Sequence, residues 1–180
     1  DLVQGIIMIG TLVILPLVAW FELSGTGSNF NMDWSTLYGG KTGAAAIAAA
    51  IGGLSWGLGY LGQPHLVARY MAIDKAENIA VSRNIAYAWA VPAFFGAMFI
   101  GLIGTALIQN GLLIIEGNTI NSIGDLPDPE KLMPIMANNL LPAWIAGIFI
   151  SGAIAAMMST ADSQLLVSTT VLTEDITRKY

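Results

Sequence analysis

Long apolar stretches separated by short polar segments dominate this chain. Four of these stretches contain no Asp, Glu, Lys or Arg over 20 or more consecutive residues. An α-helix rises about 1.5 Å per residue, so roughly 20 apolar residues cross the ~30 Å hydrocarbon core of a bilayer. The pattern therefore predicts four transmembrane helices, at about residues 2–21, 43–64, 84–107 and 142–171.

The composition fits a lipid environment better than water. Hydrophobic residues make up 55% of the 180 residues and charged residues only 11%, whereas about a quarter of an average soluble domain is charged. The alternative is a set of buried helices in a soluble protein, but such a protein would have too little polar surface for solvation. We therefore expect an all-α integral membrane protein that contacts the lipid bilayer and binds no nucleic acid.

The chain begins with Asp1 in place of an initiating Met, and no basic segment precedes the first apolar stretch. We therefore expect an internal fragment of a longer protein. Five of the seven Lys and Arg residues lie in the polar segment at residues 65–83 or at the end of the chain. Because short basic loops stay in the cytoplasm, we expect a cytoplasmic loop at residues 65–83 and a cytoplasmic chain end.

The second predicted span ends in a glycine-rich segment, GGLSWGLGYLGQPH, at residues 52–65. Glycine costs about 1 kcal/mol relative to alanine in a helix interior, and a broken membrane helix is tolerated where it is packed in protein or lines a cavity. Trp56 and Tyr60 are four residues apart, so they share a helix face and could form the wall of a small-solute pocket. Alternatively, the glycines serve close helix packing and the aromatic residues anchor the helix at the interface.

The last predicted span contains AAMMSTADSQ, residues 155–164. Ser159 and Thr160 follow Ala156 by three and four residues, so their hydroxyls and the Ala156 carbonyl share one helix face. Hard cations bind oxygen ligands, and these neutral oxygens could form a weak, reversible sodium site. Alternatively, both hydroxyls donate hydrogen bonds to carbonyls one turn earlier.

Asp162 is the acidic residue within this span, and a carboxylate at membrane depth is costly and usually functional. It lies near the predicted cytoplasmic end, so we interpret it as a residue solvated in an inner cavity rather than as a direct ion ligand. The sequence contains no cysteine, and it shows no nucleophile triad, phosphate-binding glycine loop or metal-ligand cluster. The sequence therefore does not indicate an enzyme.

Two segments are similar to signature regions of a known family. WGLGYLGQPHLVARYMA, residues 56–72, and SGAIAAMMSTADSQLLVSTTVLTEDI, residues 151–176, resemble the sodium/solute symporter family, and most closely its sodium/proline members. The resemblance implies a bundle of about thirteen helices with an inverted repeat of five plus five helices as its core. This chain would supply the sixth to the ninth helix, so that residues 1–180 are part of one transmembrane transport domain.

The resemblance also implies roles for single residues. The sodium ligands of the family's ninth helix match Ala156, Ser159 and Thr160, and an early helix outside this chain would complete the ion site. Positions for substrate binding or gating in the family's seventh helix match Trp56, Tyr60 and Pro64.

The function implied by the resemblance is sodium-coupled import of a small solute by alternating access, with L-proline as the predicted substrate. The expected location is the bacterial inner membrane, where the chain would work with the remaining helices of its parent protein. Two alternatives stay open: a sodium symporter for another small solute, such as an organic acid or a sugar, and the transporter-like membrane domain of a sensor protein.

Overall fold

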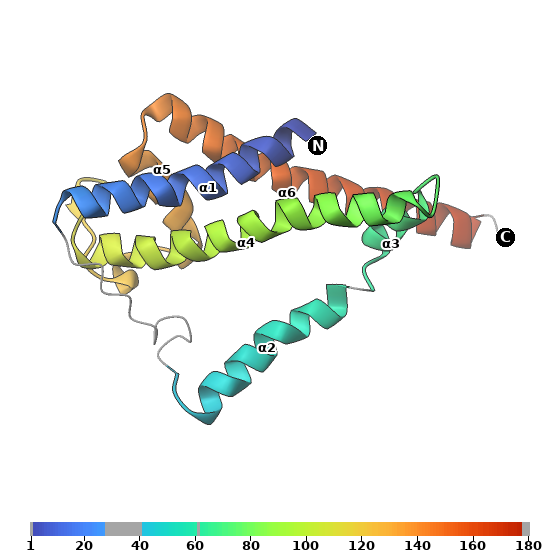
Figure 1. Ribbon diagram of the computed structural model, residues 1–180, viewed down its shortest axis with the longest axis horizontal. Coiled ribbons are helices and arrows are strands. Elements are labelled where there is room, and N and C mark those ends of the chain that lie inside the picture. The colour runs from blue at the N-terminus through green and yellow to red at the C-terminus, as the bar shows by residue number, and fades with distance from the viewer. Residues whose placement is uncertain (1, 28–40, 61, 178–180) are drawn as a thin grey trace. The chain divides into compact units, whose positions relative to one another are not determined.

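A computed structural model describes residues 2–27, 41–60 and 62–177, except for the side chains of Trp56, His65 and residues 175–177. The described chain is mostly helical (Figure 1). Its helices are α1 (Leu2–Gly25), α2 (Ala44–Tyr60), α3 (Pro64–Met71), α4 (Asn78–Gln109), α5 (Leu132–Leu140) and α6 (Ala143–Val171). Two short strands, β1 (Ile114–Ile115) and β2 (Asn118–Thr119), two 3-10 helices, η2 (Ile123–Asp125) and η3 (Pro129–Lys131), and a final π-helical turn, η4 (Leu172–Thr177), complete it.

Three of the described helices are long and apolar enough to cross a membrane: Leu2–Gly25, Asn78–Gln109 and Ala143–Glu174. They correspond to the first, third and fourth predicted spans. The second predicted span is the 17-residue helix α2, which ends at Tyr60 rather than at Pro64. Such a helix rises only about 25 Å, so the count of four spans stays a prediction.

The prediction of a loop without helices at residues 65–83 is wrong, because α3 and the start of α4 occupy much of this range. Gln63 is extended, with φ −73° and ψ 119°, and Pro64 stands at the first turn of α3. Proline suits this position because its fixed φ is helical and its missing N–H would have no partner there. A basic, mixed-polarity segment can therefore fold as a helix although its low hydropathy gives no sign of a span.

The described residues divide into two compact units. The first unit contains α1, α4 from Asn84 onward, the β1–β2 hairpin, α5 and α6 as far as Ser159. The second unit contains α2, α3, the turn after α3, the start of α4 as far as Arg83, and α6 from Thr160 onward.

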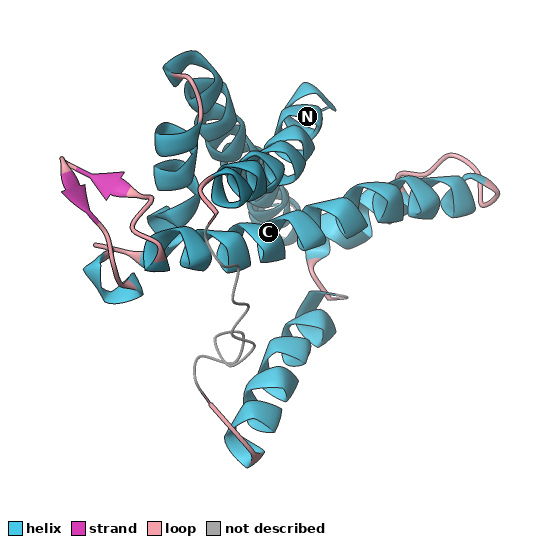
Figure 2. Cartoon of the chain, turned by 60° about the vertical axis from the view of Figure 1, so that its left-hand side comes forward, coloured by secondary structure: helices cyan, strands magenta, loops and turns pink. Residues whose placement is uncertain are grey.

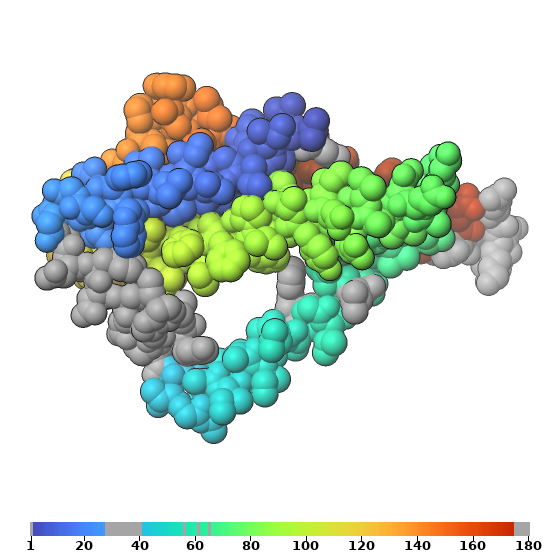
Figure 3. Space-filling model, viewed as in Figure 1, coloured from blue at the N-terminus to red at the C-terminus, as the bar shows by residue number. Residues whose placement is uncertain are grey.

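In the first unit, α1 packs most closely on α4 at Gly96. A β-carbon added at Gly96 would overlap the backbone carbonyl oxygen of Leu12. This carbonyl lacks its usual donor, because Pro16, four residues later in α1, has no N–H. Gly96 thus allows the α4 backbone to cover a polar group that lipid could not satisfy. In Figure 3 the atoms of α1 and α4 lie directly against each other.

Two further contacts hold α1 in the first unit. The indole Nε1 of Trp89 in α4 donates a hydrogen bond to the carbonyl of Gly5, at 3.2 Å. Gly152 in α6 lies against Ile7, so closely that an added β-carbon would overlap the Ile7 side chain. Small residues at such crossings are typical of membrane helices, which associate through van der Waals contact rather than a hydrophobic driving force.

The apolar core of the first unit lies where α1, the end of α4 and α5 meet, and Leu15 and Leu23 of α1 are buried in it. Leu107, Ile108, Leu113 and Met136 are fully buried there. The hairpin beyond α4, whose strands are magenta in Figure 2, pairs Ile114 with Thr119 and Ile115 with Asn118. Its two turn residues, Glu116 and Gly117, have φ values of 50° and 83°. Positive φ at both central residues is the geometry that matches the twist of a two-residue hairpin.

Asn139 of α5 attaches this hairpin to the helix. Its side-chain oxygen accepts from the N–H of Ile114 at 2.9 Å, and its Nδ2 donates to the carbonyls of Ile114 at 3.0 Å and Ile135 at 2.8 Å. The amide of one side chain therefore satisfies both backbone groups of a strand residue.

An apolar cavity of about 410 Å³ lies between α1 and α4. Prolines from both helices border it, Pro16 from α1 and Pro92 from α4. The remaining lining residues are Val13, Leu17, Trp20, Phe95, Gly96, Phe99 and Ile103.

Replacing Gly96 by alanine should destabilise the first unit. The added methyl group would force α1 and α4 apart at the Leu12 carbonyl, and overpacking of this kind costs about 1–3 kcal/mol. Gly101→Ala is the matched control, because no atom lies within 4 Å of a β-carbon added at Gly101 in the same helix. We expect a lower unfolding temperature of the detergent-solubilised protein for Gly96→Ala only; equal temperatures for both variants would contradict the close contact.

Asn139→Ala should loosen the hairpin, because it removes the three hydrogen bonds of that side chain. The loss is worth about 1 kcal/mol per bond at most, since these groups are exposed and water replaces the amide. Hydrogen–deuterium exchange of residues 111–121 should become faster, whereas Asn138→Ala, at the exposed neighbouring position, should leave it unchanged. Unchanged exchange in Asn139→Ala would show that the strands hold without this side chain.

Candidate functional site

The three predicted sodium ligands lie on one regular helix. Ala156, Ser159 and Thr160 all belong to α6, which continues without a break from Ala143 to Val171. Ala156 and Ser159 are half-buried and Thr160 is exposed. Because the helix is regular at Ala156, the carbonyl keeps a helical donor and would offer a cation its second lone pair.

A less exposed stripe runs along α6 at intervals of three and four residues. Its members in this part of the helix are Ala153, Ala156, Ser159, Ser163 and Val167, all half-buried. Since 3.6 residues complete a turn, these positions lie above one another on one face. Two of the candidate ligands, Ala156 and Ser159, therefore share a face with another small polar residue, Ser163, which follows Ser159 by one turn.

Hydroxyl groups on α6 commonly bond to the preceding turn. Ser168 donates to the carbonyl of Gln164 and Thr170 to that of Leu166, each at 2.8 Å. Ser159 and Thr160 also make interactions in the structure, so the alternative of back-bonding is not set aside. The two interpretations are compatible, because a hydroxyl that donates backward keeps lone pairs with which to bind a cation.

Asp162 is exposed on α6, two residues after Thr160. Its position on the helix differs from that of the half-buried stripe, which passes through Ser159 and Ser163. The interpretation of Asp162 as a solvated carboxylate in an inner cavity stays a prediction.

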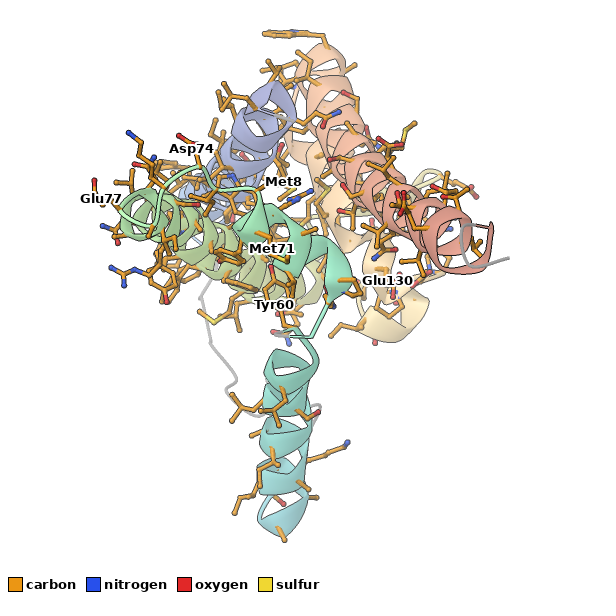
Figure 4. The ribbon with its side chains drawn as sticks, turned by 90° about the vertical axis from the view of Figure 1, so that its right-hand side faces the viewer. Met8, Tyr60, Met71, Asp74, Glu77 and Glu130 are labelled. Carbon is orange, nitrogen blue, oxygen red and sulfur yellow. The ribbon has the colours of Figure 1, made fainter. Side chains whose placement is uncertain are left out.

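The predicted substrate or gating residues surround a break between two helices. α2 ends at Tyr60, whose side chain is 44% exposed, and α3 begins at Pro64. At the break, the N–H of Gly62 donates to the Gly59 carbonyl at 3.2 Å and that of Gln63 to the Tyr60 carbonyl at 3.4 Å. In Figure 4, Tyr60 lies at the end of α2 that leads into α3. The helix is thus interrupted within the glycine-rich segment 52–65, between Tyr60 and Pro64.

The glycines of α2 have open space around them. Among the described residues, no atom outside the local helix backbone lies within 4 Å of a β-carbon added at Gly52, Gly53, Gly57 or Gly59. Leu54 and Leu58 on the same helix are 76% and 79% exposed. Close packing therefore explains these glycines only through partners that are not among the described residues. The backbone of Trp56 lies in α2, and its side chain is outside the described part.

One contact of this region was not predicted. The guanidinium Nη2 of Arg69 in α3 donates to the hydroxyl of Ser163 in α6, at 3.1 Å. From the sequence, Arg69 contributes only to the predicted membrane orientation. Its contact with Ser163 could not be predicted, because the two residues are 94 positions apart. The signal available in the sequence was weak: both residues lie in the two segments that resemble family signatures.

The apolar helices of spanning length define a multi-pass, membrane-embedded protein. The Sodium:solute symporter family matches residues 1–180, and the chain belongs to this family. It is a family of transporters, and its name implies sodium as the coupling ion.

Several curated proteins are similar to the chain over nearly its whole length. The osmoregulated proline transporter OpuE of Bacillus subtilis is 33% identical over 186 residues, which is 100% of this chain and 35% of that protein. The high-affinity proline transporter PutP of the same organism is 35% identical over 182 residues, 98% of this chain and 35% of PutP. The sodium/proline symporter of Haemophilus influenzae is 32% identical over 190 residues, 100% of this chain and 36% of that protein.

The chain spans about a third of the length of these relatives, 35% to 36%. No solved structure gives a significant match.

Proposed function

We propose that the protein to which this chain belongs imports L-proline together with sodium by alternating access. The observation that carries the proposal is the family match over residues 1–180, joined to relatives that are named as proline transporters. The chemistry of α6 supports it, because neutral oxygen donors at consecutive turns suit a cation that must bind and leave in each cycle.

In this mechanism, sodium binds the carbonyl of Ala156 and the hydroxyls of Ser159 and Thr160, and a helix outside this chain completes the site. Neutral ligands hold the ion weakly, so its occupancy follows the sodium gradient. A membrane potential contributes about 2.3 kcal/mol per charge per 100 mV, which is sufficient to drive accumulation of the solute.

Proline binds near Trp56 and Tyr60 in the outward-open state. The break between α2 and Pro64 directly follows Tyr60 and supplies backbone groups there, as at the discontinuous helices of secondary transporters. Joint occupancy by sodium and proline then favours the inward-open state, in which Asp162 helps to hydrate the inner cavity.

The membrane arrangement follows from the same proposal. α2 serves as a fourth span, and the four spans belong to a larger bundle with a five-plus-five inverted repeat. Residues 1–180 form part of its single transport domain, together with the remaining helices. The protein lies in the bacterial inner membrane, with residues 65–83 and the end of this chain in the cytoplasm, as the distribution of Lys and Arg indicates.

Thr160→Ala should raise the sodium concentration needed for half-maximal proline uptake roughly tenfold or more. A hydroxyl that contacts a charged group contributes about 1.5–3 kcal/mol, and 1.4 kcal/mol corresponds to a factor of ten. The measurement is uptake of labelled proline into vesicles that contain the full-length protein, at graded sodium concentrations.

Thr170→Ala is the matched control, because that hydroxyl donates to the Leu166 carbonyl farther along α6 and it should not affect sodium dependence. Competition by a panel of small solutes tests the substrate in the same assay. If well-folded native protein takes up no proline in a sodium gradient, the proline assignment fails; if both threonine variants behave alike, the ion site is not at Thr160.

A further inference from the structure

The hydrogen bond between Arg69 and Ser163 joins two elements that the proposed function treats separately. Arg69 is in the last turn of α3, which begins at Pro64 directly after the helix break. Its Nη2 lies 3.1 Å from the hydroxyl oxygen of Ser163 in α6, and both residues belong to the second unit. The contact therefore connects the segment that follows the candidate gating residues with the helix that carries the candidate ion ligands.

Ser163 occupies a specific place on α6. It follows Thr160 by three residues and Ser159 by four, so it is the next polar side chain on the half-buried stripe of that helix. An ion at Thr160 that displaced this part of α6 would also move the acceptor of the Arg69 hydrogen bond, since a regular helix moves as a rigid element over one turn.

The chemistry of the pair makes the contact directional. A guanidinium has donors but no acceptor and stays charged at any physiological pH, so Ser163 must act as the acceptor. The serine hydroxyl can meanwhile donate its own proton elsewhere. The contact therefore needs a hydroxyl at position 163 and a long donor at position 69, and it needs no change of protonation.

α3 depends on such contacts for its position. A helix of only eight residues is marginal by itself in water, and its neighbours determine where it lies. It is flanked by the helix break on one side and on the other by the turn with Asp74 and Glu77 (Figure 4), which leads into α4. The hydrogen bond to Ser163 attaches the end of α3 that is farther from the break.

We propose that Arg69 is a positioning residue of the transport cycle, which holds α3 against the ion-binding face of α6 and thereby couples sodium occupancy to the break before Pro64. This inference rests on the proposed sodium site. Coupling is reciprocal: if sodium strengthens the contact, the contact strengthens sodium binding by the same factor. Loss of the contact therefore lowers the apparent sodium affinity although Arg69 is not a ligand.

The first test is the sodium dependence of proline uptake by the full-length protein. Arg69→Gln and Ser163→Ala should each raise the half-maximal sodium concentration about fivefold or more, with the maximal rate little changed. The double variant should be no worse than the more affected single variant, because both remove one interaction. Ser163→Thr keeps the hydroxyl and should restore nearly native sodium dependence, and Ser168→Ala, whose hydroxyl donates to the Gln164 carbonyl, is the control.

The second test needs no substrate. Sodium, compared with the same concentration of choline, should slow hydrogen–deuterium exchange of residues 64–71 in the native protein, and Arg69→Gln should abolish that difference. Two results would overturn the inference and leave the sodium site intact. One is sodium protection of residues 64–71 that persists in Arg69→Gln. The other is a double variant in which the fold-changes of the two single variants multiply. Absence of any sodium effect in native protein would instead overturn the proposed function, and the inference with it. Protection of native α3 in a protein that takes up no proline would remove only the proline assignment.

Discussion

The spacing between α1 and α4 at Gly96 is the constraint on which the first unit depends. Pro16 removes the donor for the Leu12 carbonyl, and the α4 backbone covers that carbonyl where Gly96 has no side chain. With α1 fixed at this distance, Trp89 reaches the Gly5 carbonyl and Ile7 reaches Gly152 of α6. In lipid, where apolar surface alone gives helices little reason to associate, such close backbone contacts determine which helices are neighbours.

The sequence predicts the long helices because their signal is strong and local. Absence of charge over 20 or more residues is sufficient to locate α1, α4 and α6, and Pro64 marks a real boundary between two helices. The sequence predicts a loop where α3 and residues 78–83 of α4 lie, because hydropathy detects burial in lipid and these segments are of mixed polarity. Which residue of α4 faces Leu12 could not be predicted, since the small residues of α4 include Gly96, Gly101 and Gly104 and the sequence does not rank them.

The candidate site shows the same division. The residue types on α6 indicate oxygen donors, and helical spacing places Ala156, Ser159 and Thr160 on adjacent turns without any knowledge of tertiary structure. The contact partner of that face could not be predicted, because α4, the hairpin and α5 separate Arg69 from Ser163 along the chain. A contact over such a separation depends on the arrangement of helices, and the periodicity of either helix alone contains no information on it.

The two prolines that border the apolar cavity have a mechanical consequence for the first unit. Pro16 deprives the Leu12 carbonyl of its donor, and Pro92 does the same to the carbonyl of Ala88. Each helix therefore lacks one backbone hydrogen bond beside the same space of about 410 Å³. A helix without proline would have to break a hydrogen bond to bend at these positions, whereas α1 and α4 already lack it. The adjacent space can accept the aromatic side chains that such a bend displaces.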